Sequence, residues 1–204
     1  MTVAVSPFIG LPLGSRIASF RRFTVPEYHR LIDLGILTED DELELLDGHL
    51  VRKTSRNPDH DTGIDLFREV VGRLMPAGRM LRCQEPVSLS GSEPEPDFAV
   101  VRGGPWSFRL RHPSPTDIDF VVEVSNTTLD TDRADKSVLY GHAGIVEYWI
   151  VNVADRQIEV FTQPTGPTPQ PGYAVRTDHL PGQTVPLTLD GQLLAKIPVD
   201  DLLP

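Results

Sequence analysis

The sequence predicts an α/β fold in which helices flank a mixed β-sheet. Two observations point to it. Between residues 57 and 153, a helical pattern is followed by three strand patterns, a second helical pattern and a further strand. Three successive strands can form an antiparallel meander, and the second helix allows a crossover into a parallel neighbour.

The chain has 204 residues, of which 39% are hydrophobic and 24% charged, as is usual for a globular protein. We expect an N-terminal arm over residues 1–22 and a single domain over residues 23–204. The lone Cys83 excludes an internal disulfide framework and a Cys-rich zinc site. The N-terminus lacks a basic leader, and no apolar run reaches membrane-spanning length. We therefore expect a cytoplasmic protein without a membrane partner.

The formal net charge of −10 is unusual for a nucleic-acid-binding protein, because such proteins gain affinity by neutralising phosphates. Any nucleic-acid role must rest on a local basic patch or on metal ions. Two candidate patches are Arg16, Arg21 and Arg22, and Arg102, Arg109, Arg111 and His112. Taken alone, each patch is better interpreted as solvated surface charge.

The segment after the arm predicts a helix and a hairpin. Thr24 and Glu27 have the spacing of a capping box, and Gly35 can close the helix. In "ELELLDGHLVRK", Asp47 and Gly48 form a two-residue turn between apolar strands.

The first helix of the central pattern comes next, in "NPDHDTGIDLFREVVGRLMP". Ile64, Phe67, Val71 and Leu74 recur at helical spacing, and Pro76 marks its end.

The strands follow over residues 79–89, 97–102 and 119–125, and the second helix over about residues 131–142. A strand at 147–153 can pair with residues 157–162, and the tail adds one or two short strands. A Pro/Gly-rich surface loop, "QPTGPTPQPG", separates the tail from the sheet.

Two acidic residues stand at the start of one central strand and inside the next. Asp97 follows Pro96, and Glu123 lies in "DFVVEVS", where it shares a face with Val121. If these strands pair, both carboxylates can reach the same edge of the sheet. Together with the Val124 carbonyl they would offer the oxygen ligands that Mg²⁺ or Mn²⁺ prefers. The alternatives are that Asp97 is only a turn residue and that Glu123 pairs with an arginine.

Four segments, taken together, carry a resemblance to a known family: "ELLDGHLV", "PDFAVV", "VVEVSNTTLDTDRADKSVLY" and "GIVEYWIVNV". In this order and spacing, from about residue 24 to about residue 161, they resemble the Uma2 family, within the PD-(D/E)XK nuclease superfamily. The resemblance implies a restriction-endonuclease-like core with an αβββαβ order of elements. The superfamily motif is an acid after proline, then an acid, any residue and a lysine. Asp97 and Glu123 match the two acids, but Ser125 stands where the lysine belongs.

The resemblance implies that the lysine has moved onto the following helix, as Lys136. A helix packed back over the strand could return its ammonium to the site, and Lys136 shares a helix face with Asp132 and Tyr140. The alternative is a surface lysine that pairs with Asp132.

Three further residues match family positions or superfamily positions. Glu44 in "ELLDG" matches an upstream acid that could act beside the metal, although a solvated strand-edge glutamate is an equal alternative. His60 in "NPDH" matches a recurrent histidine whose role the sequence leaves open, and Glu69 is a weaker candidate than Glu44.

The resemblance implies a Mg²⁺- or Mn²⁺-dependent endonuclease that hydrolyses phosphodiester bonds, with DNA as the favoured substrate. Asp97, Glu123, Lys136 and Glu44 would be its catalytic residues, and Asp97, Glu123 and Val124 its metal ligands. The competing hypothesis, favoured by the displaced lysine and the acidic charge, is a non-catalytic or regulatory module that keeps the fold. A homodimer is expected by fold-level analogy alone.

Overall fold

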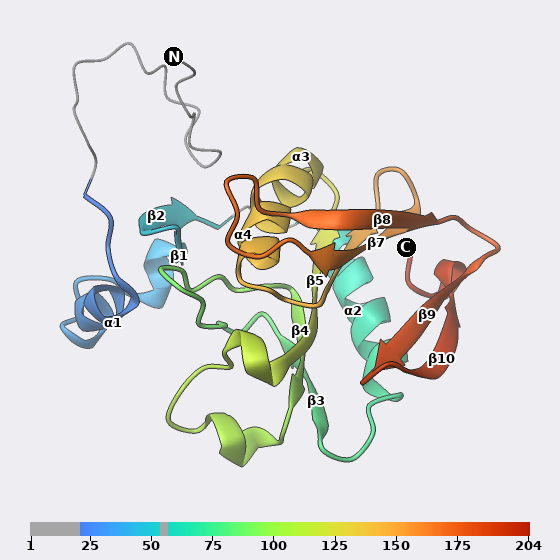
Figure 1. Cartoon of the computed structure of the whole chain (residues 1–204), viewed down its shortest axis with the longest axis horizontal. Helices are drawn as coiled ribbons and strands as arrows, with labels where there is room; N and C mark the ends of the chain where they lie inside the picture. The colour runs from blue at the N-terminus through green and yellow to red at the C-terminus, as the bar shows by residue number, and fades with distance from the viewer. Residues whose placement is uncertain (1–20, 54–56) are drawn as a thin grey trace, which may run out of the picture.

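The structure, a computed structural model, describes residues 21–53 and 57–204. The first 20 residues of the predicted arm lie outside the described residues. A six-stranded sheet with the order β3-β4-β5-β6-β7-β8 forms the centre (Figure 1). Its strands are β3 (Arg79–Cys83), β4 (Phe98–Arg102), β5 (Ile118–Ser125), β6 (Glu147–Asn152), β7 (Gln157–Pro164) and β8 (Tyr173–His179). β5 and β6 are parallel and all other neighbours are antiparallel, which confirms the mixed sheet.

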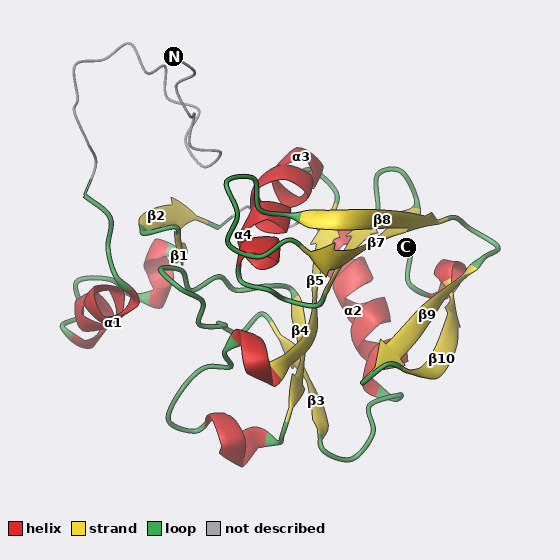
Figure 2. Cartoon of the chain, viewed as in Figure 1, coloured by secondary structure: helices red, strands yellow, loops and turns green. Residues whose placement is uncertain are grey.

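Helices and a hairpin cover the two faces of this sheet (Figure 2). On one face lie α2 (Pro58–Gly72) and the hairpin of β9 (Thr184–Leu189) and β10 (Gln192–Pro198). On the other lies a helical segment made of α3 (Leu129–Thr131), a π-helical turn (Asp132–Lys136) and α4 (Ser137–His142). Short 3₁₀ turns occupy Glu39–Asp41, Pro105–Phe108, Pro115–Asp117 and Val199–Asp201. No helix of the described residues is long and apolar enough to cross a membrane.

The N-terminal elements match their predicted signals. α1 (Val25–Asp33) begins with the expected capping box, in which the Glu27 amide donates to the Thr24 hydroxyl and the Thr24 amide to the Glu27 carboxylate. The hairpin of β1 (Leu43–Leu46) and β2 (His49–Arg52) turns at Asp47 and Gly48, with φ of 47° and 76°. Two positive φ angles are typical of a type I′ turn.

The predicted strand over residues 79–89 is too long. β3 ends at Cys83, because Gln84 turns to a φ of 53° and Pro86 cannot donate a ladder hydrogen bond. The chain then leaves the sheet and runs beside β1, where Glu93 forms a bridge with Leu45. This departure places the segment before Asp97 next to the N-terminal hairpin.

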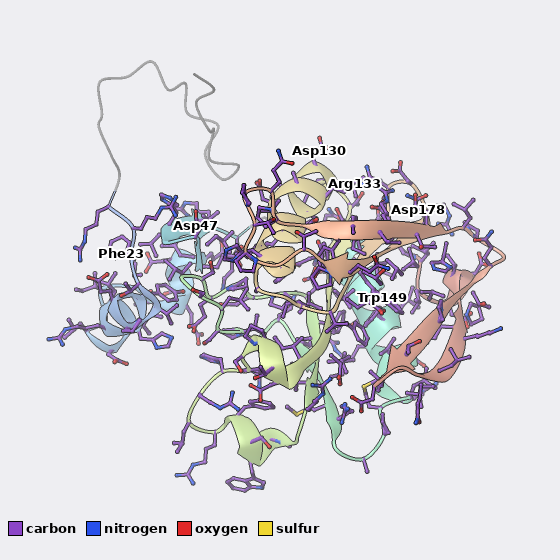
Figure 3. All side chains as sticks on the ribbon, in the orientation of Figure 1. Phe23, Asp47, Asp130, Arg133, Trp149 and Asp178 are labelled. Atoms are coloured by element: carbon purple, nitrogen blue, oxygen red, sulfur yellow. The ribbon has the colours of Figure 1, made fainter. Side chains whose placement is uncertain are left out.

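The two faces of β5 contribute to two separate cores. Phe120, Val122 and Val124 pack on the α2 side, and Val121 on the α4 side, as the strand alternation predicts. Trp149 of β6 lies beside α2 (Figure 3), and its ring meets Phe67 edge to face at 6.3 Å. Glu123 therefore belongs to the face that α4 covers.

Close packing brings α2 against the end of β5. A Cβ atom added to Gly63 would lie 2.8 Å from a methyl carbon of Val124, which is closer than such atoms normally approach. The glycine lets the first turn of α2, with His60, lie beside the carboxyl end of β5.

Candidate active site

Asp97 lies directly before β4 and is held by three donors. Its Oδ2 accepts a hydrogen bond from the Val124 amide at 2.8 Å and lies 3.3 Å from His60 Nε2. Its Oδ1 accepts from the Gln84 side-chain amide at 3.2 Å. The carboxylate is thus fixed at the edge where β4 begins and β5 ends.

Glu123 points from β5 toward the helical segment and is only 6% exposed. Its Oε1 accepts a hydrogen bond from the Tyr140 hydroxyl at 2.8 Å and lies 3.4 Å from Lys136 Nζ. Its Oε2 lies 3.4 Å from the backbone amide of Asp97. One oxygen therefore meets the helical segment and the other faces Asp97.

Lys136 is buried between two glutamates. Besides Glu123, its ammonium lies 3.2 Å from Glu44 Oε1, which β1 supplies. Glu44 is itself buried and accepts a hydrogen bond from the Glu95 amide at 3.1 Å. The interpretation of Lys136 as a surface residue, and of Glu44 as a solvated one, is therefore wrong.

The π-helical turn explains how the lysine reaches this position. Within the turn the Ser137 amide bonds to the Asp132 carbonyl, five residues earlier, which widens the helix by one residue. Asp132, Lys136 and Tyr140 all become buried on the side that faces the sheet. The Asp132 carboxylate accepts a hydrogen bond from the Thr128 hydroxyl at 2.6 Å.

The four predicted site residues, Glu44, Asp97, Glu123 and Lys136, line one cavity of about 160 Å³ together with His60, Val124 and Asp132. Four buried carboxylates line this cavity: Glu44, Asp97, Glu123 and Asp132. Among the described residues, they contact at most two positive charges, Lys136 and His60.

Burial raises the pKa of Glu123 to about 8, although Lys136 opposes the shift. Burial also raises the pKa of Asp132. Burial lowers the pKa of Lys136, but Glu123 and Glu44 outweigh this and hold it above its usual value. The hydrogen bond to Asp97 raises the pKa of His60. The cavity as a whole therefore carries an excess of negative charge, and the raised pKa of Glu123 means that this carboxylate holds a proton at a higher pH than usual.

This donor set suits a hard divalent cation. Asp97 and Glu123 supply carboxylate oxygens. In a β-strand, the amide and the carbonyl of one residue point to the same side of the strand. Because the Val124 amide points at Asp97, the Val124 carbonyl also faces the Asp97 side. Oxygen ligands and an uncompensated negative charge fit Mg²⁺ or Mn²⁺.

Several groups at the site were not identified from the sequence. Gln84 gives no signal, because it reaches Asp97 only through its left-handed backbone turn. Asp132 and Tyr140 do give one, since they share a helix face with Lys136. Glu69 lies outside the cavity, where it is exposed and pairs with Arg73 at 2.7 Å.

The predicted basic patches are largely neutralised. Arg22 pairs with Asp47, Arg102 with Asp119 and Arg111 with Asp117. Arg21 pairs with Glu27, and Arg16 lies outside the described residues. Arg52 and Lys53 line the cavity itself, where Lys53 pairs with Glu95 at 2.6 Å.

The mixed sheet with its flanking helices defines a nuclease-like α/β fold. A crystal structure described as a putative nuclease belonging to DUF820, from Anabaena variabilis, is similar to this chain with a TM-score of 0.57. The two are 15% identical, and the similarity covers 84% of this chain and 96% of the other, so it concerns the fold. The family model of Uma2, described as "putative restriction endonuclease", matches residues 25–195. The chain belongs to the Uma2 family. No curated protein matches it.

Proposed function

We propose that this chain is a Mg²⁺- or Mn²⁺-dependent endonuclease that hydrolyses phosphodiester bonds of DNA. One observation supports the proposal above all others. Two carboxylates, Asp97 directly before β4 and Glu123 in the neighbouring β5, line a cavity with excess negative charge, and a buried lysine lies 3.4 Å from Glu123. Acids and a lysine in this arrangement are the groups that metal-assisted hydrolysis of a phosphodiester needs.

In this proposal Asp97, Glu123 and the Val124 carbonyl hold the cation. A cation bound there would lower the pKa of a water ligand and neutralise charge on the phosphate. Glu123 would present Oε2 to the cation beside Asp97, because Tyr140 and Lys136 contact the other oxygen of Glu123.

Lys136 would orient the attacking water and stabilise the charge that develops on the phosphate. Glu44 would keep the ammonium charged and correctly placed, since its Oε1 lies 3.2 Å from Lys136 Nζ. Arg52 at the cavity would attract the phosphate backbone despite the acidic net charge. Cutting both strands of a duplex would need two copies, so the proposal includes a homodimer.

The test is a cleavage assay on supercoiled and linear DNA, and on RNA, with Mg²⁺, Mn²⁺ or EDTA. We expect metal-dependent cleavage that Asp97→Ala and Glu123→Ala abolish and that Lys136→Met reduces by at least about 100-fold. Glu69→Gln changes an exposed glutamate outside the cavity and should leave cleavage unchanged. Cleavage that survives both Asp97→Ala and Glu123→Ala would refute the site. Binding of DNA without cleavage by the unaltered chain would favour the non-catalytic module.

A further inference from the structure

Two histidines and a glutamate from three separate segments converge outside the proposed nuclease site. His29 lies on α1, Glu93 in the segment that bridges to β1, and His112 in the loop between β4 and β5. A ligand atom from each lies within 4.8 Å of the other two. We propose that these side chains form a second metal site, for a divalent transition-metal ion of the Zn²⁺ type.

The glutamate is the fixed member of this trio. Glu93 is 3% exposed, and its Oε2 accepts a hydrogen bond from the Ser88 hydroxyl at 2.6 Å. Its other oxygen, Oε1, lies 2.6 Å from His29 Nε2. An outer hydrogen bond that orients a ligating carboxylate is what metal sites commonly provide.

The histidines approach from the side that opens to solvent. The ring of His112 meets that of His29 edge to face at a centroid distance of 6.2 Å. Ser88 also fixes the loop that carries His112, because its amide donates to the Pro113 carbonyl at 2.8 Å. The trio borders a cavity of about 330 Å³ in which Asp33 and Glu95 add two further acids.

The ligand types select the class of ion. Two imidazoles and one carboxylate suit Zn²⁺ and neighbouring transition metals, whereas Mg²⁺ favours oxygen ligands alone. Three protein ligands leave a fourth position, which the cavity supplies for water. Zn²⁺ bound to both side chains would replace the direct contact between His29 Nε2 and Glu93 Oε1.

The three segments suggest what the ion does. The Tyr28 hydroxyl of α1 donates a hydrogen bond to the Leu43 carbonyl of β1, and α1 lies at one end of the molecule (Figure 1). An ion shared by His29, Glu93 and His112 would tie α1 to the loop before β5. The proposal does not depend on nuclease activity, because none of the three ligands lines the nuclease cavity, although Glu95 borders both cavities.

The test uses the untagged full chain in an Asp97→Asn, Glu123→Gln background, which removes the proposed Mg²⁺ ligands. Co²⁺ is titrated and followed by its visible absorption, and Zn²⁺ is then added as a competitor. We expect one equivalent of Co²⁺ to bind, Zn²⁺ to displace it and Mg²⁺ in excess to leave it in place. Zn²⁺ should also raise the unfolding temperature of this background protein.

Variants assign the ligands. His29→Ala and His112→Ala should each weaken Zn²⁺ binding at least about tenfold, and Ser88→Ala by about 10- to 100-fold. His142→Ala removes an exposed histidine at the end of α4 and should leave the affinity unchanged. Both histidine ligands are partly exposed, so these variants should fold, which circular dichroism verifies. Absence of binding, or equal losses in His142→Ala and the ligand variants, would overturn the proposal.

Discussion

Lys136 Nζ lies 3.4 Å from Glu123 Oε1, although the lysine stands on the helical segment and not two residues after the glutamate. Ser125 occupies that nearer position and is fully buried, 3.3 Å from the Thr128 hydroxyl. The π-helical turn thus places the Lys136 ammonium beside Glu123, where β5 itself supplies no positive charge. This ion pair joins β5 to the helical segment, so the packing of each element depends on the other.

Replacing Lys136 by methionine should lower the free energy of unfolding by about 3 kcal/mol. The substitution keeps the length of the side chain but leaves Glu123 and Glu44 buried without their cation. The loss stays near the low end of the range for broken buried pairs, because Glu123 can take up a proton. Urea unfolding followed by circular dichroism measures it.

Lys53→Met is the matched control. Lys53 pairs with Glu95 at 2.6 Å, but its side chain is 36% exposed. An exposed pair contributes up to about 1 kcal/mol. Equal losses in the two lysine variants would contradict the buried ion pairs of Lys136 with Glu123 and Glu44.

The raised pKa of Glu123 predicts that Mn²⁺ binding strengthens with pH. The pKa is about 8 in the metal-free protein against an ordinary value of 4.5, so a cation must displace a proton at neutral pH. The folded state holds this proton more tightly than the unfolded state. The stability of the metal-free protein should therefore fall as the pH rises from about 4.5 to about 8.

Calorimetric titrations with Mn²⁺ at several pH values test this linkage. Below the pKa of Glu123 the affinity should rise by up to about tenfold per pH unit, and then level off above it. In Glu123→Gln that dependence should disappear, and only the weaker contribution of His60 should persist. An affinity of the unaltered chain that is constant between about pH 6 and pH 9 would show that Glu123 is already ionised.

The sequence predicted the paired strands and the buried glutamate because both follow from local alternation. Val121 and Glu123 occupy one face of β5 and Val122 and Val124 the other, as an apolar strand in a sheet requires. The position of Lys136 was implied by family resemblance alone, since helical periodicity does not reveal a π-helical turn. Gln84 was unpredictable for a related reason, because its role depends on one left-handed residue that ends β3.

Tyr140→Phe should lower the affinity for Mn²⁺ in addition to lowering the free energy of unfolding. The hydroxyl donates to Glu123 Oε1 at 2.8 Å, and its loss leaves Lys136 as the partner of that oxygen. We expect a stability loss of about 1–2 kcal/mol and a further rise in the pKa of Glu123. Calorimetry with Mn²⁺, together with urea unfolding, separates the two effects.

Tyr173→Phe provides the comparison. Its hydroxyl donates to the Ile145 carbonyl at 2.9 Å and lies outside the cavity. The stability loss should be similar, with no change in Mn²⁺ affinity. If Tyr140→Phe and Tyr173→Phe bind Mn²⁺ with the same affinity, the Tyr140 hydroxyl does not contribute to cation binding.

Gly63→Ala should destabilise the protein although alanine favours helices. Its Cβ would lie 2.8 Å from a methyl carbon of Val124, and that side chain is 2% exposed and β-branched, so it cannot rotate away. We expect a loss of about 1–3 kcal/mol, with α2 and His60 displaced from Asp97. Gly72→Ala, in the last turn of the same helix, would place its Cβ 3.9 Å from Leu81 and should be neutral or stabilise by up to about 1 kcal/mol. Thermal unfolding of the two variants measures the difference, and a Gly63→Ala protein as stable as Gly72→Ala would mean that α2 does not press on β5.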